Sequence, residues 1–133
     1  MRGTPQTMKN ETDYDHIMLD LQVYFSEKIN QAKAAGIKDI IIDPGYGFSK
    51  TIQQNFEVMQ NLEMFHIHNC PILVGVSRKS MIYNTIGTSA DEALNGTTAL
   101  NTFALTKGAS ILRVHDVKEA KEVIDLTMAI RNA

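Results

Sequence analysis

Two residues near the C-terminus have the types and spacing to bind an anion together. Arg113 and His115 follow the apolar run 110–112, and residues two apart on a strand point to the same face. Arginine grips an anion through two parallel N–H groups, and histidine adds another donor. The alternative for Arg113 is a structural arginine–aspartate pair inside the protein. The position at a strand end favours the anion clamp.

Two further polar segments follow apolar runs in the same way. They are Ser77-Arg78-Lys79-Ser80 after the run 72–76, and Asp43-Pro44-Gly45-Tyr46-Gly47-Phe48 after the run 40–42. Lys79 can donate to a carbonyl or ring nitrogen of a ligand, and Arg78 can hold a neighbouring acid. Asp43 can accept from the N–H groups of a ligand, with Phe48 as an aromatic wall. The alternative for both segments is a plain turn, since Asp-Pro-Gly favours turns.

The elements that must position these side chains alternate along the chain. Continuous β-branched runs at 39–42, 72–76 and 110–112 are typical of strands buried on both faces of a parallel sheet. Apolar residues at three- and four-residue steps predict helices over 13–35, 56–65, 93–104 and 120–130. Capping boxes are expected at Thr51 with Gln54, Ser89 with Glu92, and Asp116 with Glu119. Residues 83–88 are predicted to form a loop.

This alternation indicates an α/β fold of right-handed βαβ units in one domain, residues 1–133. Residues 1–4 look like the end of a fourth parallel strand. A complete (β/α)8 barrel needs ~250 residues, so the chain would supply the C-terminal half of one. A small flavodoxin-like sheet is the alternative. In either fold, Asp43, Lys79, Arg113 and His115 would converge on one crevice at the carboxyl ends of the strands.

Composition argues against nucleic acid and membranes as partners. The chain has 133 residues, 44% of them hydrophobic and 21% charged, as in soluble globular proteins. A net charge of -2 without a basic cluster argues against nucleic acid and anionic membranes. The apolar runs are too short to span a bilayer, which takes ~20 residues. Cys70 is the one cysteine, which predicts a reducing, cytoplasmic location.

Four segments together resemble the dihydropteroate synthase family. They are residues 1–8 (MRGTPQTM), 43–48 (DPGYGF), 75–80 (GVSRKS) and 113–117 (RVHDV), in the family's order and spacing. The resemblance implies a pterin-binding (β/α)8 barrel, a transferase of folate biosynthesis. That enzyme joins 6-hydroxymethyl-7,8-dihydropterin pyrophosphate to p-aminobenzoate and releases pyrophosphate.

The resemblance also implies a role for each site residue. Asp43 would bind the amino and ring N–H edge of the pterin, and Lys79 would donate to its acceptor edge near the aminobenzoate. Phe48 and Ser80 would border the aminobenzoate, where sulfonamides also bind. Arg113 and His115, with Val114 between them, would hold the pyrophosphate. Lys79, Arg113 and His115 would be the catalytic residues.

The family's first four strands have no counterpart in these residues. Missing with them is the asparagine that ligates Mg²⁺ in the family, so no metal ligand is expected in this chain. The chain is thus expected to be a fragment of the enzyme, inactive alone, that forms homodimers through helices at 53–65, 90–107 and 117–130. Two alternatives are a methyltetrahydrofolate-binding methyltransferase domain and a non-catalytic half-barrel that self-associates through its open strand edges.

Overall fold

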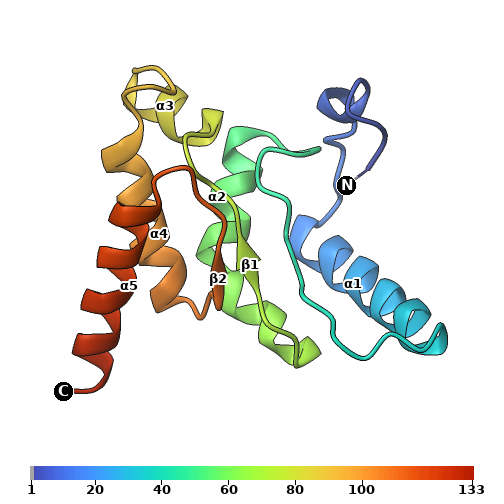
Figure 1. Ribbon diagram of the computed structural model, residues 1–133. Coiled ribbons are helices and arrows are strands. Elements are labelled where there is room, and N and C mark those ends of the chain that lie inside the picture. The colour runs from blue at the N-terminus through green and yellow to red at the C-terminus, as the bar shows by residue number, and fades with distance from the viewer. Residues whose placement is uncertain (1) are drawn as a thin grey trace.

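The computed structural model describes residues 2–133, and helices make up most of its regular structure (Figure 1). The α-helices are α1 (Ile17–Ala34), α2 (Ile52–Gln60), α3 (Ser80–Ile86), α4 (Leu94–Thr106) and α5 (Val117–Arg131). Two short 3₁₀ helices are η1 (Met8–Asn10) and η2 (Leu62–His68), and the strands are β1 (Leu73–Val74) and β2 (Ile111–Leu112). No helix within residues 2–133 combines the length and apolar character that crossing a membrane requires.

The sheet is parallel and its strands follow the order of the chain. Leu73 of β1 pairs with Ile111 of β2, and on the other side Ile42 forms a parallel bridge to Ile72. These three segments run side by side in the same direction, so that the loops at their carboxyl ends gather at one edge (Figure 1). The predicted parallel α/β arrangement is confirmed, although the strands are shorter than the apolar runs.

The predicted fourth strand is wrong for the residues that can be described. Met1 lies outside them, and residues 2–4 form no strand. Gly3 has a φ of 69°, and the Thr4 N–H donates to Thr7 Oγ1 at 2.9 Å. The Thr4 carbonyl in turn accepts from the N–H groups of Thr7 and Met8. These backbone groups are satisfied within a local turn, and none of them joins a strand ladder.

One of the three predicted capping boxes is confirmed. Thr51 caps α2, where Gln54 N–H donates to Thr51 Oγ1 at 3.2 Å and Thr51 N–H donates to Gln54 Oε1 at 2.8 Å. Ser89 contributes only its backbone carbonyl to a turn, and α4 begins beyond it without a side-chain cap. Asp116 precedes α5 but does not cap it, because its carboxylate binds Arg78 instead.

The loop predicted over residues 83–88 is wrong, because most of that stretch belongs to α3 (Ser80–Ile86). Met81 and Ile82 anchor this short helix in the core. Gly87, with a φ of 72°, provides the left-handed conformation that ends it. Gly96 of α4 lets the two helices approach closely, since a Cβ there would lie 2.3 Å from Ile82 Cγ2.

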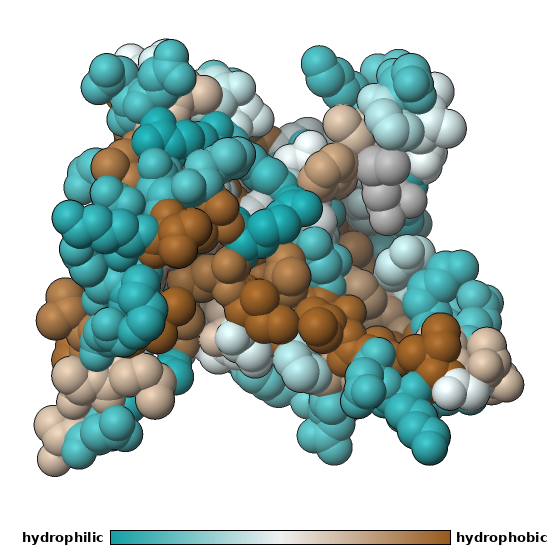
Figure 2. All heavy atoms as spheres, in the orientation of Figure 1, coloured by the Kyte–Doolittle hydropathy of each residue, from teal (hydrophilic) through white to brown (hydrophobic). Residues whose placement is uncertain are grey.

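The helices cover one face of the sheet and leave the other open. Ile42 points into the core and is 1% exposed, whereas its neighbour Ile41 points the other way and is 53% exposed. An apolar band crosses the open face where the strands lie (Figure 2). The prediction of strands buried on both faces therefore holds for only one face within residues 2–133. Three strand segments are too few to close into a barrel that would bury the other face.

Candidate functional site

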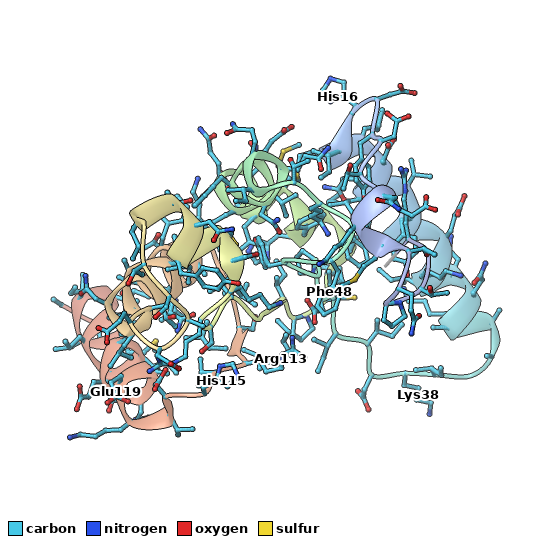
Figure 3. All side chains as sticks on the ribbon, turned by 90° about the horizontal axis from the view of Figure 1, so that it is seen from above. His16, Lys38, Phe48, Arg113, His115 and Glu119 are labelled. Atoms are coloured by element: carbon cyan, nitrogen blue, oxygen red, sulfur yellow. The ribbon has the colours of Figure 1, made fainter. Side chains whose placement is uncertain are left out.

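A hollow of about 480 Å³ lies at the carboxyl ends of β1 and β2. Its lining residues are Gly75, Ser77, Arg78, Lys79, Arg113, Val114 and His115. Arg113 and His115 lie near each other along the lower side of the view in Figure 3, with Phe48 close by, while His16, Lys38 and Glu119 lie farther away. The structure thus brings the predicted residues Lys79, Arg113 and His115 together.

The residue pairing of β1 and β2 continues past the strand ends, in the loops that line this hollow. Leu73 pairs with Ile111 in the ladder. Beyond the ladder, the side chains of Ser77 and His115 are hydrogen-bonded across the same separation of 38 residues, and those of Arg78 and Asp116 likewise. The parallel pairing therefore sets which side chains of the two loops meet.

Arg113 presents its guanidinium to the hollow. Its backbone N–H donates to the Val74 carbonyl at 2.9 Å, which fixes the strand end. The side chain lies against Gly75, where a Cβ would come within 3.0 Å of both Nε and Nη2. Within residues 2–133 the guanidinium makes no hydrogen bond or ion pair. Arg113 therefore does not form the structural arginine–aspartate pair considered as its alternative role. Another arginine, Arg78, forms such a pair.

Arg78 and Asp116 form an ion pair with two hydrogen bonds, each 2.9 Å long. The bonds to Arg78 hold the pKa of the Asp116 carboxyl below its ordinary value. Arg78 also donates to the carbonyls of Ala90 and Asp91 at 2.9 and 2.6 Å. Its backbone φ of 55° turns the chain there, and its N–H donates to Thr97 Oγ1 at 3.0 Å. The sequence-based expectation that Arg78 holds a neighbouring acid is confirmed.

His115 is held by a serine that the sequence analysis did not assign to the site. Ser77 Oγ lies 2.8 Å from His115 Nδ1, within hydrogen-bond distance. The same oxygen accepts a hydrogen bond, 3.2 Å long, from the His115 backbone N–H. Ser77 is 4% exposed. Extending the strand register from Leu73 and Ile111 would have found this contact, but the register is not visible in the sequence.

Lys79 joins the hollow to the loop after residue 42. Its amine donates to the Tyr46 carbonyl and lies 4.8 Å from the centre of the Phe48 ring. Burial lowers the pKa of Lys79 to about 8, with a further lowering from Arg113 that Asp43 partly offsets. Near neutral pH this amine therefore releases its proton more readily than an ordinary lysine.

Asp43 and Phe48 line a second cavity of about 360 Å³, beside α1, and not the hollow itself. Asp43 is exposed and accepts a hydrogen bond from the Gly45 N–H at 2.9 Å. This bond shapes an Asx turn, so the predicted turn and the predicted site occur together. Asp43 is near enough to Lys79 and Lys50 for its charge to offset part of the lowering of their pKa by burial.

Lys50 holds the loop of the second cavity in shape, and the sequence analysis did not single it out. Its amine donates to the carbonyls of Pro44, Gly45 and Phe48 at 2.8, 3.0 and 3.1 Å. Burial lowers the pKa of Lys50 to about 8, against an opposing effect of Asp43. The preceding Ser49 has a φ of 51° and donates through Oγ to the Arg2 carbonyl at 2.7 Å.

The remaining predicted residues are less central. Val114 is half-buried and lines the hollow between Arg113 and His115. Ser80 is the half-buried first residue of α3 and is not among the residues that line either cavity. Among the described residues, no three His, Cys, Asp or Glu side chains are grouped so that they could hold a metal ion.

The arrangement combines two kinds of chemistry in adjacent places. Arg113, His115 and Lys79 offer N–H donors and positive charge to an anion. Asp43 and Phe48 offer a carboxylate and an aromatic ring, which suit a flat ligand with N–H groups. Lys79 lies between the two, with its amine over the Phe48 ring and near Arg113. A ligand with a planar ring and an anionic tail would fit this layout.

Comparison with known proteins gives a consistent result. A family model described as "Pterin binding enzyme" matches residues 1–115. The dihydropteroate synthase of Escherichia coli (strain K12) is 39% identical over 135 residues, which cover 100% of this chain and 48% of that enzyme. The enzyme of Clostridium beijerinckii is 43% identical over 122 residues, 90% of this chain and 45% of that enzyme. The chain spans about half the length of the curated relatives it matches.

Solved structures agree with the sequence matches. The Yersinia pestis dihydropteroate synthase with a sulfonamide drug complex superposes with a TM-score of 0.96 at 36% identity, over 100% of this chain and 49% of that one. The Thermus thermophilus enzyme in complex with 4-aminobenzoate superposes with a TM-score of 0.90 at 30% identity, over 94% of this chain and 49% of that one. The residues described here thus match about half of a (β/α)8 barrel.

Proposed function

This chain belongs to the pterin-binding enzymes, and from that membership we propose that it carries part of the active site of a dihydropteroate synthase. The reaction would join 6-hydroxymethyl-7,8-dihydropterin pyrophosphate to p-aminobenzoate and release pyrophosphate. The C–O bond at the pterin methylene carbon breaks, and the aminobenzoate nitrogen forms the new C–N bond and loses a proton. The relatives described above are dihydropteroate synthases, which supports this reaction over that of a methyltransferase.

The anion clamp is the observation that carries this proposal. Arg113 and His115 share one hollow, and the Arg113 guanidinium has no acidic partner within residues 2–133. Negative charge develops on the pyrophosphate as the C–O bond breaks. Donors that are already in place at that charge lower the barrier, because they need not reorganise during the reaction. In this proposal Arg113 and His115 hold the leaving group.

The loop after residue 42 is proposed to receive the pterin and the aminobenzoate. Asp43 would accept hydrogen bonds from the pterin N–H edge, and Lys79 would donate to the opposite edge. Phe48 and Ser80 would border the aminobenzoate, where a sulfonamide would compete. The contact of Lys79 with the Phe48 ring supports this placement. Ser80 has the weakest support, because it lines neither cavity. Positioning the amine against the methylene carbon would supply much of the rate enhancement.

Magnesium belongs to the proposed reaction, but its ligands are not assigned to this chain. The resemblance predicts Mg²⁺ in the complete enzyme. The described residues contain no cluster of three His, Cys, Asp or Glu side chains that fits a metal ion. In this proposal the chain's own residues bind and orient the substrates and hold the departing pyrophosphate.

A pyrophosphate titration of the chain tests the clamp directly. Calorimetry or NMR should detect weak binding in the wild type. Arg113→Ala should weaken it more than tenfold, because a charge-assisted hydrogen bond is worth ~1.5–3 kcal/mol. His115→Ala should weaken it less, since it removes one donor and no fixed charge. Lys38→Ala, at the margin of the molecule (Figure 3), is the matched control. Binding that survives Arg113→Ala unchanged would overturn the assignment.

A homodimer through α4 and α5 is also proposed. Leu126 and Ile130 of α5 are 68% and 78% exposed, and Phe103 of α4 is half-exposed. Exposed apolar side chains gathered on neighbouring helices are typical of protein–protein interfaces. Sedimentation equilibrium should give twice the chain mass of 14.8 kDa, and Leu126→Glu with Ile130→Glu should give the monomer mass. A wild-type monomer at high concentration would contradict the dimer. The cytoplasmic location remains a prediction from the sequence.

A further inference from the structure

The hydroxyl of Ser77 can be assigned a direction from its two contacts with His115. The His115 backbone N–H can only donate, so Ser77 Oγ accepts that bond, which is 3.2 Å long. Ser77 Oγ also lies 2.8 Å from His115 Nδ1. The hydroxyl has one hydrogen to donate, and the ring nitrogen is the acceptor within reach. A neutral ring could instead donate from Nδ1 to the second lone pair of Ser77 Oγ, but the hydroxyl hydrogen of this buried side chain would then have no acceptor among residues 2–133. Burial therefore favours donation from the hydroxyl to Nδ1.

This assignment fixes which nitrogen of the ring carries the proton. A neutral imidazole has one N–H, and if Nδ1 accepts a hydrogen bond the proton must be on Nε2. Within residues 2–133, His115 Nε2 has no hydrogen-bond partner. His115 is exposed and lines the hollow beside Arg113. The Nε2–H group is thus left free to donate to a ligand.

We propose that Ser77 is a positioning residue that locks neutral His115 in the Nε2–H form, so that the ring can donate a hydrogen bond to the anion held by Arg113. The inference rests on the proposed function for the identity of the anion, a pyrophosphate or another phosphate ester. Ser77 lines the hollow but is only 4% exposed. Its effect passes through the orientation and the tautomer of the imidazole.

The lock has a clear physical advantage for an anion site. If the proton were on Nδ1, the bare Nε2 lone pair would face the anion and repel it. An imidazole in water exchanges between the two forms, and binding would then have to select one of them. The buried Ser77 hydroxyl holds the ring in the donating form before the ligand arrives, which reduces the cost of ordering on binding.

The test is a ¹⁵N NMR measurement of the His115 ring in the 133-residue chain, taken to a pH at which the histidine is neutral. In the wild type, Nδ1 should show the shift of an unprotonated acceptor and Nε2 that of a protonated nitrogen. Ser77→Ala should give intermediate shifts, because the tautomers then exchange. It should also weaken pyrophosphate binding roughly two- to tenfold, as expected for one lost hydrogen bond. Ser26→Ala, on the exposed side of α1, should change neither.

The outcomes separate this inference from the proposed function. A wild-type ring with the proton on Nδ1 overturns the lock, even if pyrophosphate binds as expected. A Ser77→Ala variant with the wild-type tautomer and affinity overturns it as well. A correct tautomer in a chain that binds no pyrophosphate overturns the proposed function instead. The wild-type spectrum decides the tautomer even if Ser77→Ala fails to fold.

Discussion

Asp116 accepts two hydrogen bonds from Arg78, although its position in the sequence marks it as the cap of α5. Both bonds are 2.9 Å long, and α5 begins without a side-chain cap. Arg78 simultaneously holds the carbonyls of Ala90 and Asp91. The pair therefore fastens the loop after β1 to the loop after β2 and to the segment before α4. These are the loops that carry Lys79 and His115.

Replacing Arg78 should disturb the hollow without touching a proposed ligand contact. In Arg78→Ala we expect a lower melting temperature and weaker pyrophosphate binding, because the loops that carry Lys79 and His115 lose a shared anchor. Lys118→Ala, at an exposed position of α5, is the control for the loss of a positive charge. Thermal unfolding by circular dichroism and calorimetric titration measure the two effects. Unchanged pyrophosphate affinity in Arg78→Ala would show that the loops hold their positions without the pair.

The same pair predicts a contribution to acid stability. Hydrogen bonding to Arg78 lowers the pKa of Asp116 in the folded chain. A carboxyl with a lowered folded pKa stabilises the fold above its unfolded pKa, and this contribution disappears as the pH falls through the lower value. Asp116→Asn should therefore reduce stability at neutral pH and flatten its acid dependence. Urea unfolding at several pH values below neutrality is the measurement. Parallel curves for the variant and wild type would contradict the linkage.

Gly75 should be sensitive to the smallest possible addition. A Cβ at this position would lie 3.0 Å from Nε and Nη2 of Arg113, so Gly75→Ala should displace the guanidinium. Because the φ of Gly75 is not in the left-handed region, the backbone tolerates alanine. We expect pyrophosphate affinity to fall by roughly two- to tenfold, in line with a partial loss of one charge-assisted contact. Full affinity in a folded Gly75→Ala variant would mean that Arg113 binds from another position.

Anion binding should be linked to proton uptake at Lys79. The pKa of this amine in the free chain is about 8. A bound anion favours the charged amine and raises its pKa, so the complex takes up protons near that pH. Affinity should therefore decrease as the pH rises through and above 8. Titrations in buffers of different ionisation enthalpy measure the uptake, and Lys79→Met should abolish it. Identical heats in all buffers would contradict this role.

Lys50 should stabilise the fold through the loop that it holds. Lys50→Met leaves three half-buried carbonyls without their donor, and we expect a loss of about 1–3 kcal/mol. Burial lowers the pKa of Lys50 in the folded chain to about 8, from 10.5 for an ordinary lysine. The unfolded chain then binds more protons between these values, so this lysine makes stability rise with pH in that window. Urea unfolding across this window should show a smaller rise in Lys50→Met. If the stability of Lys50→Met depended on pH in the same way as that of the wild type, the lowered pKa of the buried Lys50 amine would be wrong.

The placement of the site could be predicted from the sequence because it follows from strand ends. Apolar runs that stop at Asp43, Ser77 and Arg113 put the polar residues that follow at one edge of a parallel sheet. The structure places Lys79, Arg113 and His115 in one hollow as predicted, but Asp43 lines the second cavity instead. The type and spacing of residues sufficed for Lys79, Arg113 and His115. No knowledge of which strand residues face each other was required.

Contacts between distant residues could not be predicted in this way. Asp116 has the local pattern of a helix cap, but a guanidinium 38 positions earlier in the chain competes successfully for its carboxylate. Ser77 is an ordinary polar residue until the strand register places it under His115. Lys50 is an ordinary surface lysine until the turn that begins at Asp43 aims three carbonyls at its amine. Each of these roles depends on long-range geometry, which a single sequence does not contain.

The constant separation between partners in the hollow follows from the strand pairing and not from the length of the chain that connects them. The strand pairing places Ser77 and Arg78 opposite His115 and Asp116. Between these two loops the chain makes an excursion away from the sheet, which contains α3 and α4, and then returns to it. Lengthening such an excursion costs little, about 0.6 kcal/mol for each doubling of a flexible loop. An insertion of several residues within it would leave every pair opposite its partner. An insertion of a single residue between Leu73 and Ser77 would instead shift the serine and the arginine off their partners together.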